Sequence, residues 1–160
     1  SGLAFSLYLY AFRIFMGYII LWPMKKNNDI RTGRHCVFNM HVHLVFVTKY
    51  RKKVLDARAF EILRESFTKV CADFEAELIE FNGEHDHVHL LVYYPPKVAV
   101  SALVNSLKGA SSRVLRKRYP DVAERYYKNV LWSPSYFAAS CGGAPISIIR
   151  QYVEQQQTPD

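Results

Sequence analysis

The segment "GEHDHVHLLVYY", Gly83 to Tyr94, carries three histidines at alternate positions directly before a run of apolar residues. Its aliphatic and aromatic side chains predict a β-strand over residues 87–94. Successive side chains on a strand point to opposite faces, so His87 and His89 share one face while Val88 enters the core on the other. Two imidazoles two residues apart on a rigid strand can bind one ion, and the segment therefore indicates a divalent-metal site.

The same H-x-H pattern occurs a second time, in "NMHVHLVFV" at Asn39 to Val47. This segment also predicts a strand, and it places His41 and His43 on one face. Spacing alone does not choose between the two histidine pairs. The alternative for either pair is a set of core or surface histidines that bind no metal.

Composition and charge narrow the class of protein. The 160 residues predict one domain with a real core, and a hydrophobic share of 50% predicts a folded chain. A net charge of +7 favours a polyanionic partner, nucleic acid first or else an acidic membrane surface, and the alternative is a merely soluble basic protein. The three cysteines show no C-x-x-C spacing, which argues against a disulfide framework or a cysteine zinc site and fits a reducing cytoplasm.

The first 23 residues differ from the rest, because Arg13 is the one charge in an apolar and aromatic run that ends at Pro23. A charge near the middle is costly in a bilayer, and the run lacks the features of a signal peptide. We expect residues 1–23 to be an apolar extension outside the core domain and residues 24–160 to form a single domain, with no membrane partner. The alternatives are a membrane anchor or a helix packed on the domain.

The periodicity of the remaining chain predicts the other elements. Amphipathic helices are expected from Asp56 to about Glu77 and from Ala99 to about Tyr119, further strands at 77–82 and within 131–140, and a last helix from Pro145 to about Gln157. The order β-α-β-β-α-β-α predicts an α+β fold, an antiparallel sheet sandwiched with helices in a ferredoxin-like or RRM-like topology.

The last helix carries a second set of chemical groups. Tyr152 and Gln156 are four residues apart and therefore lie one above the other. A phenol is a poor nucleophile at neutral pH unless it is activated, and a nearby metal can polarise a target phosphate instead. An amide oxygen one turn away can add a metal ligand. The alternative for the tyrosine is a side chain at the edge of the core.

Several segments together resemble a known family. They are "HLVFVTKYRKKVL" at 43–55, "DHVHLLV" at 86–92, "LKGASSRVLRKRYP" at 107–120, "LWSPSYF" at 131–137 and "RQYVEQQ" at 150–156. In this order they resemble the single-tyrosine HUH transposases of small bacterial insertion sequences, the TnpA-like family. The resemblance covers about residues 36–157 and does not extend over residues 1–23.

The resemblance implies an enzyme that cuts and rejoins single-stranded DNA at element ends. It places His87, His89 and Gln156 as ligands of Mg²⁺ or Mn²⁺, and Tyr152 as the nucleophile that forms a 5′-phosphotyrosine link. It further implies a homodimer with active sites shared between chains, acting on DNA with hairpins near the element ends. By the same match His43 is an ordinary strand histidine and His41 is incidental.

Basic side chains gather in two stretches of the sequence that suit phosphate contact. The predicted DNA-binding residues are Lys49, Arg51, Lys52, Lys53, Lys108, Arg113, Arg116, Lys117 and Arg118. The alternative for such runs is a solvated helix face. Gly142 and Gly143 predict a hinge before the last helix, or else a plain tight turn.

Two other functions fit the same fold. One is a nucleic-acid-binding module without catalysis, in which the histidines are structural. The other is a domesticated enzyme that nicks DNA at a locus no longer mobile. The chain shows no P-loop pattern, and exchange of one phosphodiester for another requires no ATP.

Overall fold

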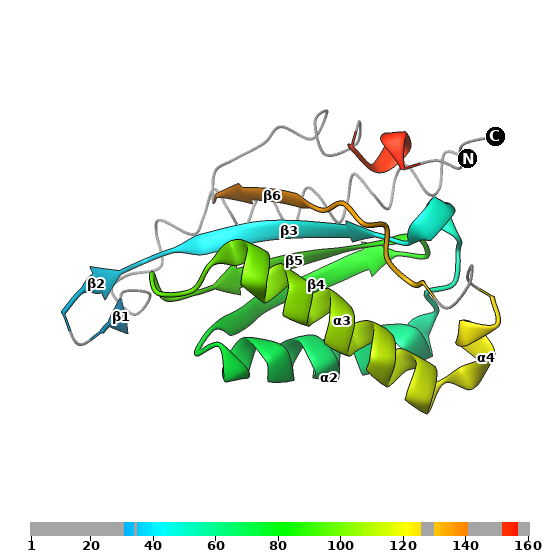
Figure 1. The fold of residues 1–160 in the computed structure, drawn as a ribbon, viewed down its shortest axis with the longest axis horizontal. Helices are drawn as coiled ribbons and strands as arrows, with labels where there is room; N and C mark the ends of the chain where they lie inside the picture. The colour runs from blue at the N-terminus through cyan, green and yellow to red at the C-terminus, as the bar shows by residue number, and fades with distance from the viewer. Residues whose placement is uncertain (1–30, 34, 126–129, 141–151, 157–160) are drawn as a thin grey trace.

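The computed structural model describes residues 31–33, 35–125, 130–140 and 152–156. Its main sheet consists of β4 (Glu77–Glu84), β5 (His87–Tyr93), β3 (His41–Val47) and β6 (Phe137–Ser140), in this spatial order. All three neighbouring pairs are antiparallel. Helices α2 (Ala57–Asp73) and α3 (Val100–Arg118) cover one face of the sheet (Figure 1). The predicted α+β fold and its ferredoxin-like strand order are therefore confirmed.

The main core lies between the sheet and the two helices. Leu44 and Phe46 of β3 and Leu90 of β5 are fully buried there with Leu63 and Phe67 of α2. The rings of Phe46 and Phe67 meet edge to face, with centroids 6.0 Å apart. Burial of side chains of this size stabilises the fold by about 1.5–3 kcal/mol each, so the two-residue alternation of β3 is sufficient to fix which of its faces meets the helices.

The opposite face of the sheet carries a smaller cluster. Val45 and Val47 of β3 pack there against Val153, with Phe137 and Tyr152 at the margin. Residues 152–155 are helical, and this short segment, drawn red, lies across the sheet from α2 and α3 (Figure 1). A helix is thus confirmed at these residues. Its predicted beginning at Pro145 and the predicted hinge at Gly142 and Gly143 lie outside the described residues.

The last strand, predicted within residues 131–140, is confirmed over Phe137–Ser140, and an isolated bridge between Thr48 and Trp132 precedes it. A hairpin of β1 (Arg31–Thr32) and β2 (Val37–Phe38) was not expected. The short helix α4 (Pro120–Ala123) follows α3.

The apolar segment 1–23 lies outside the described residues. Among the helices of the described part, none combines the length and the apolar character needed to cross a membrane.

Candidate functional site

The strand register places His87 and His89 on the face that carries the smaller cluster. In the β3–β5 ladder His87 lies opposite Val47, and His89 lies opposite Val45. Residues opposite each other in an antiparallel pair project to the same face. Because Val153 packs on both valines, the two histidines share that face with residues 152–156. Their rings are nearly perpendicular, at 82°, with centroids 5.0 Å apart.

The imidazole of His87 is fixed by a carboxylate. Its Nδ1 lies 2.7 Å from Oδ1 of Asp86, and Nε of Arg51 donates to Oδ2 of the same residue at 3.0 Å. Burial on its own raises the pKa of Asp86, but the hydrogen bonds and charges of His87 and Arg51 outweigh it and the pKa is lowered. With Nδ1 bonded to Asp86, metal binding by His87 would use Nε2, as in carboxylate–histidine–metal arrangements.

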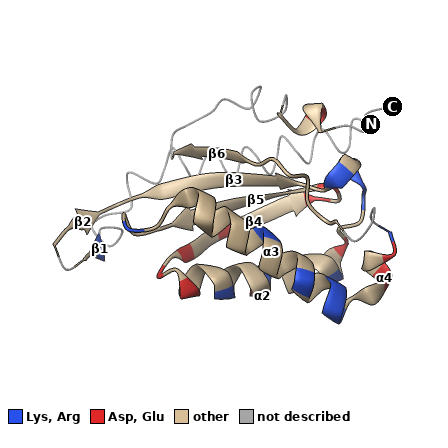
Figure 2. Ribbon diagram, viewed as in Figure 1, with Lys and Arg blue, Asp and Glu red and all other residues tan. Residues whose placement is uncertain are grey.

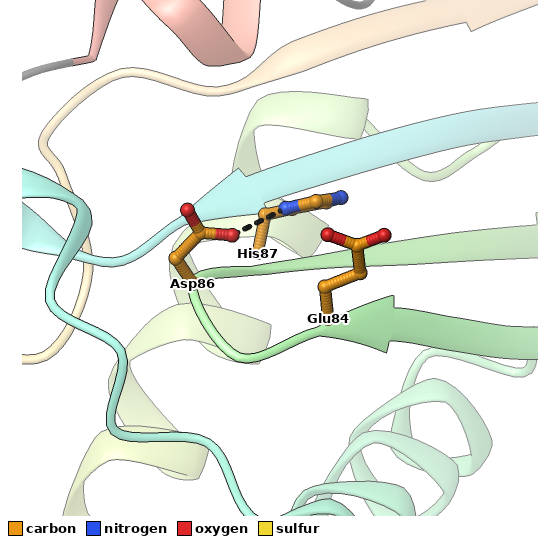
Figure 3. A group of neighbouring side chains, drawn as sticks. All are labelled: Glu84, Asp86 and His87. Carbon is orange, nitrogen blue, oxygen red and sulfur yellow. Dashed lines mark hydrogen bonds and ion pairs between the residues drawn. The ribbon is translucent and has the colours of Figure 1, made fainter. Parts of the chain in front are cut away.

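A second carboxylate lies beside the same histidine. Glu84 is opposite His87 in the β4–β5 ladder, and ligand atoms of Glu84, Asp86 and His87 all lie within 4.8 Å of one another. Figure 3 shows the three side chains at the tight connection between the strands. The backbones approach so closely here that a Cβ on Gly83 would lie 2.3 Å from the carbonyl oxygen of His87. Sequence reasoning missed both carboxylates, although they precede His87 by three residues and by one.

The turn after β3 brings Arg51 to this position. The 3₁₀ turn η2 (Lys49–Arg51) contains two non-glycine residues with positive φ, Tyr50 at 59° and Arg51 at 51°. Such backbone costs about 1–3 kcal/mol per residue and persists only where contacts enforce it. The Thr48 hydroxyl supplies such contacts, at 2.8 Å from the carbonyl oxygen of Lys52 and 3.1 Å from that of Asp86.

Two serines hold the side chains of the last helical segment. Oγ of Ser133 donates to Oε1 of Gln156 at 2.6 Å, and Oγ of Ser135 donates to the same oxygen at 3.1 Å. The Ser135 hydroxyl also lies 2.9 Å from Oη of Tyr152. The backbone N–H of Ser133 donates to the carbonyl oxygen of Val47 at 2.8 Å. Tyr152 and Gln156 therefore meet at the end of β3 that also faces His87.

Burial sets the protonation of the site. It lowers the pKa of His89 well below its ordinary value, and the neighbouring His87 and His43 lower it further. Burial raises the pKa of Tyr152, against a smaller opposing effect of its hydrogen bond with Ser135. At neutral pH the His89 ring is therefore neutral, the form that binds metals, and the phenol of Tyr152 is protonated.

The other histidine pair lies in a different setting. His41 is opposite Tyr93, at the far end of β3, and its ring stacks on that tyrosine with centroids 4.5 Å apart. His43 stacks on His89 at 5.5 Å, and burial lowers its pKa to about 4. His85, which we expected to be a turn residue outside the site, places Nδ1 2.9 Å from the carbonyl oxygen of Leu55.

The predicted DNA-binding residues fall into two groups, one at the end of β3 and one on the helical layer. Those of η2 and the exposed Lys52 and Lys53 adjoin the end of β3, whereas the basic residues of α3 lie on the helical layer (Figure 2). Some of these cations have partners within the chain. Arg118 pairs with Glu65, and Nζ of Lys108 donates to the carbonyl oxygen of Ser133 at 2.5 Å.

The donor atoms gathered here suit a small divalent cation. The sheet face offers imidazole nitrogens at His87 and His89 and an amide oxygen at Gln156, and the carboxylates of Glu84 and Asp86 lie beside His87. Such a mixed nitrogen and oxygen set, without thiolates, is compatible with Mg²⁺ or Mn²⁺. The structure thus brings all four residues of the predicted metal and tyrosine site to one face of the sheet, and adds two carboxylates to it.

Comparisons with known proteins agree in one family. The family model described as "Transposase IS200 like" matches residues 36–156. The ISDra2 transposase TnpA of Deinococcus radiodurans is 33% identical, and the match covers 88% of this chain and 97% of that protein. The transposase for insertion sequence element IS200 of Salmonella typhimurium is 27% identical over 82% of this chain and 86% of its own length.

Solved structures give the same picture. The crystal structure of a proposed transposase from Deinococcus radiodurans R1 superposes with a TM-score of 0.72 at 29% identity, covering 81% of this chain and 99% of that one. A REP-associated tyrosine transposase bound to a REP hairpin has a TM-score of 0.50 at 16% identity, covering 78% of this chain and 68% of that one. The second likeness concerns the fold alone.

Proposed function

We propose that this chain, which belongs to the family of IS200-like transposases, cuts and rejoins single-stranded DNA at insertion-sequence ends through a covalent link to Tyr152. The observation that carries the proposal is the meeting of Tyr152 and Gln156 at Ser135, on the sheet face that bears His87 and His89. The proposed nucleophile and the two proposed histidine ligands come from segments far apart in the sequence, and they lie on the same face of the sheet.

The proposed reaction is a transesterification. The phenolic oxygen of Tyr152 forms a bond to the scissile phosphorus and gives up its proton, while the bond from phosphorus to the 3′ oxygen breaks and that oxygen gains a proton. The products are a 5′-phosphotyrosine and a free 3′-hydroxyl. Rejoining is the reverse step with a different 3′-hydroxyl, so the phosphate ester is conserved and no nucleotide triphosphate is consumed.

The proposed metal ligands are His87, His89 and Gln156, and the carboxylate of Glu84 lies beside His87. A divalent cation bound to them supplies a Lewis acid for the scissile phosphate. Asp86 holds the ring of His87, and Ser135 holds the hydroxyl of Tyr152. Since the pKa of that hydroxyl is raised, its orientation by the serine matters more than its ionisation in the free protein.

We further propose that the substrate strand crosses the end of β3, where the exposed Lys52 and Lys53 can contact phosphates. One structural relative carries a bound REP hairpin, and we extend hairpin recognition to this chain as part of the proposal. A homodimer with shared active sites and a cytoplasmic location are the remaining parts. They rest on the family resemblance and on the odd number of cysteines in the sequence, which show no paired spacing.

The proposal is tested with the full chain, Mn²⁺ and single-stranded oligonucleotides that carry the ends of the element. Wild type is expected to form a covalent protein–DNA adduct that migrates above the free protein in denaturing gels, and Tyr152→Phe is expected to form none. Tyr136→Phe is the matched control, because this partly buried tyrosine packs on the main core and not on the smaller cluster.

Each result bears on one part of the proposal. Adducts that persist in Tyr152→Phe would show that another residue is the nucleophile. Binding that is unaffected by chelator, with no adduct in wild type, would instead support a nucleic-acid-binding module without catalysis.

A further inference from the structure

Lys108 lies on α3, in the basic run for which the sequence predicts contacts with DNA phosphates, but its side chain is directed elsewhere. Nζ donates to the carbonyl oxygen of Ser133 at 2.5 Å and to that of Ser135 at 3.2 Å. An ammonium group has three donors, so two of the three are used inside the chain. The stem passes the ring of Phe46, with Nζ 6.0 Å from the centroid, and the residue is only partly exposed.

The two carbonyls belong to the residues whose hydroxyls contact the candidate catalytic side chains. The Ser133 hydroxyl donates to Gln156, and the Ser135 hydroxyl contacts both Gln156 and Tyr152. Pro134 separates the two serines and cannot donate a backbone hydrogen bond. The segment therefore depends on outside partners to keep its shape.

Other contacts attach the same segment to the helix. Nε1 of Trp132 donates to Oγ of Ser111 at 3.0 Å, and that hydroxyl donates to the carbonyl oxygen of Lys108 at 3.1 Å. Trp132 is 5% exposed and belongs to the main core. One turn of α3 thus binds the segment 132–135 at both ends. Ser111 accepts from the indole of Trp132, and Lys108 donates to the carbonyl oxygens of Ser133 and Ser135.

We propose that Lys108 is a positioning residue for the transesterification, which fixes Ser133 and Ser135 so that their hydroxyls orient Gln156 and Tyr152. This role rests on the proposed function of the site. In this role Lys108 serves the reaction and does not contact DNA phosphates. It differs in this from exposed basic residues of the same helix such as Lys117.

The test compares Lys108→Met, which keeps most of the stem, with Lys117→Met and Lys69→Met. A misplacement of reacting groups by about 1 Å can cost on the order of 10²-fold in rate. Lys108→Met is therefore expected to lower kcat for single-stranded DNA cleavage by about 10- to 100-fold, with KM and the salt dependence of DNA binding unchanged. Lys117→Met serves as the reference for a phosphate contact, and the exposed Lys69 on α2 serves as the silent control.

If Lys108 instead contacted a DNA phosphate, Lys108→Met would change DNA binding and its salt dependence and leave kcat unchanged. Loss of one such contact weakens binding across sequences and lowers the slope of log affinity against log salt by about one. If Lys108→Met shows this behaviour with kcat unchanged, the positioning role is wrong. Lys108→Gln is measured in parallel in case the methionine variant does not fold, and the same two outcomes decide.

A second readout is independent of catalysis. Hydrogen exchange of the backbone amides of residues 132–136 is measured without DNA or metal, and it is expected to rise at least about tenfold in Lys108→Met while it stays unchanged in Lys69→Met. Unchanged exchange would overturn the proposal. If exchange rises in Lys108→Met but wild type shows no cleavage at all, Lys108 does hold Ser133 and Ser135 in place, and it is the proposed function that is wrong.

Discussion

The two histidine pairs have the same sequence, HVH, and lie on adjacent strands with their rings toward the same face, yet their surroundings differ. The pair on β5 stands where the strand begins, next to Asp86, Glu84 and the segment that holds Tyr152 and Gln156. The pair on β3 extends toward the other end of the sheet, where His41 stacks on an aromatic ring. The comparison teaches that position along the strand, and not the motif, decides which pair can serve chemistry.

Register is the physical reason for this difference. Antiparallel pairing sets His41 opposite Tyr93 and His87 opposite Val47, so the two pairs are displaced along the ladder. The last helical segment packs on Val45 and Val47 and therefore adjoins the β5 pair. His43 lies between the two settings, because its ring stacks on His89 while its own strand neighbours are apolar.

The largest difference between the two histidine pairs is expected when one imidazole ring is removed from each pair in turn. A bound metal contributes several kcal/mol of charge stabilisation, and each 1.36 kcal/mol is tenfold in rate. His87→Ala is therefore expected to slow DNA cleavage by on the order of 10³-fold. His41→Ala is expected to leave the cleavage rate near that of wild type and to lower stability by about 0.5–3 kcal/mol. Equal losses of cleavage in both variants would remove the distinction between the pairs.

The pH dependence of folding stability tests the setting of His43, because burial lowers the pKa of this residue to about 4. The folded pKa lies below the unfolded value near 6.5, so the unfolded chain binds more protons and stability falls as the pH falls from 6.5 toward 4. The loss attributable to this residue reaches about 3 kcal/mol at pH 4. His89, which faces His43 from β5 and whose pKa is also lowered, adds a loss of the same sign.

The measurement is denaturant unfolding of the metal-free protein, in chelator, between pH 7 and pH 4. Wild type is expected to lose more stability over this range than His43→Leu does, by about 3 kcal/mol. The leucine variant provides the control for carboxylates that titrate in the same range. Parallel curves for the two proteins would mean that the His43 ring is not held in its neutral form.

A smaller effect is expected from the carboxylate that orients His87. Asp86→Asn keeps the size of the side chain but weakens its hydrogen bond with Nδ1 and its ion pair with Arg51. Loss of such a partner costs about 10- to 100-fold in metal affinity. Titration with Mn²⁺ followed by electron paramagnetic resonance measures this, with the exposed Asp73→Asn as the control. Unchanged affinity in Asp86→Asn would show that the carboxylate has no role in holding the ring for metal.

Much of the fold follows from patterns in the sequence. The alternation in residues 87–94 and the apolar spacing of Phe60, Leu63 and Phe67 predict the elements that make up the core, and the structure contains them. The sequence predicts a last strand within residues 131–140 but not its bounds, and the structure confines it to Phe137–Ser140, because Pro134 cannot donate to a ladder and the flanking serines bond elsewhere. Local pattern carries no information about such distant partners.

The candidate site was predicted in its residue types more than in its contacts. The family resemblance selects His87, His89, Tyr152 and Gln156, including the choice between the two histidine pairs, and the structure places them on one face of the sheet. The sequence also marks Arg51 and Lys108 as cations, but charge alone cannot distinguish a contact with DNA from an internal bond. The partner of Arg51 is Asp86, 35 positions further along the chain. The partners of Lys108 are the carbonyl oxygens of Ser133 and Ser135, 25 and 27 positions further along.

Anomalous diffraction from crystals grown with Mn²⁺ tests most directly whether the histidine pair on β5 binds the metal. We expect one strong manganese peak within coordination distance of both His87 and His89, with the oxygen of Gln156 turned toward it, and no peak at His41 or His43. A peak at the β3 pair, or one held by Glu84 and Asp86 with His89 out of reach, would contradict the account.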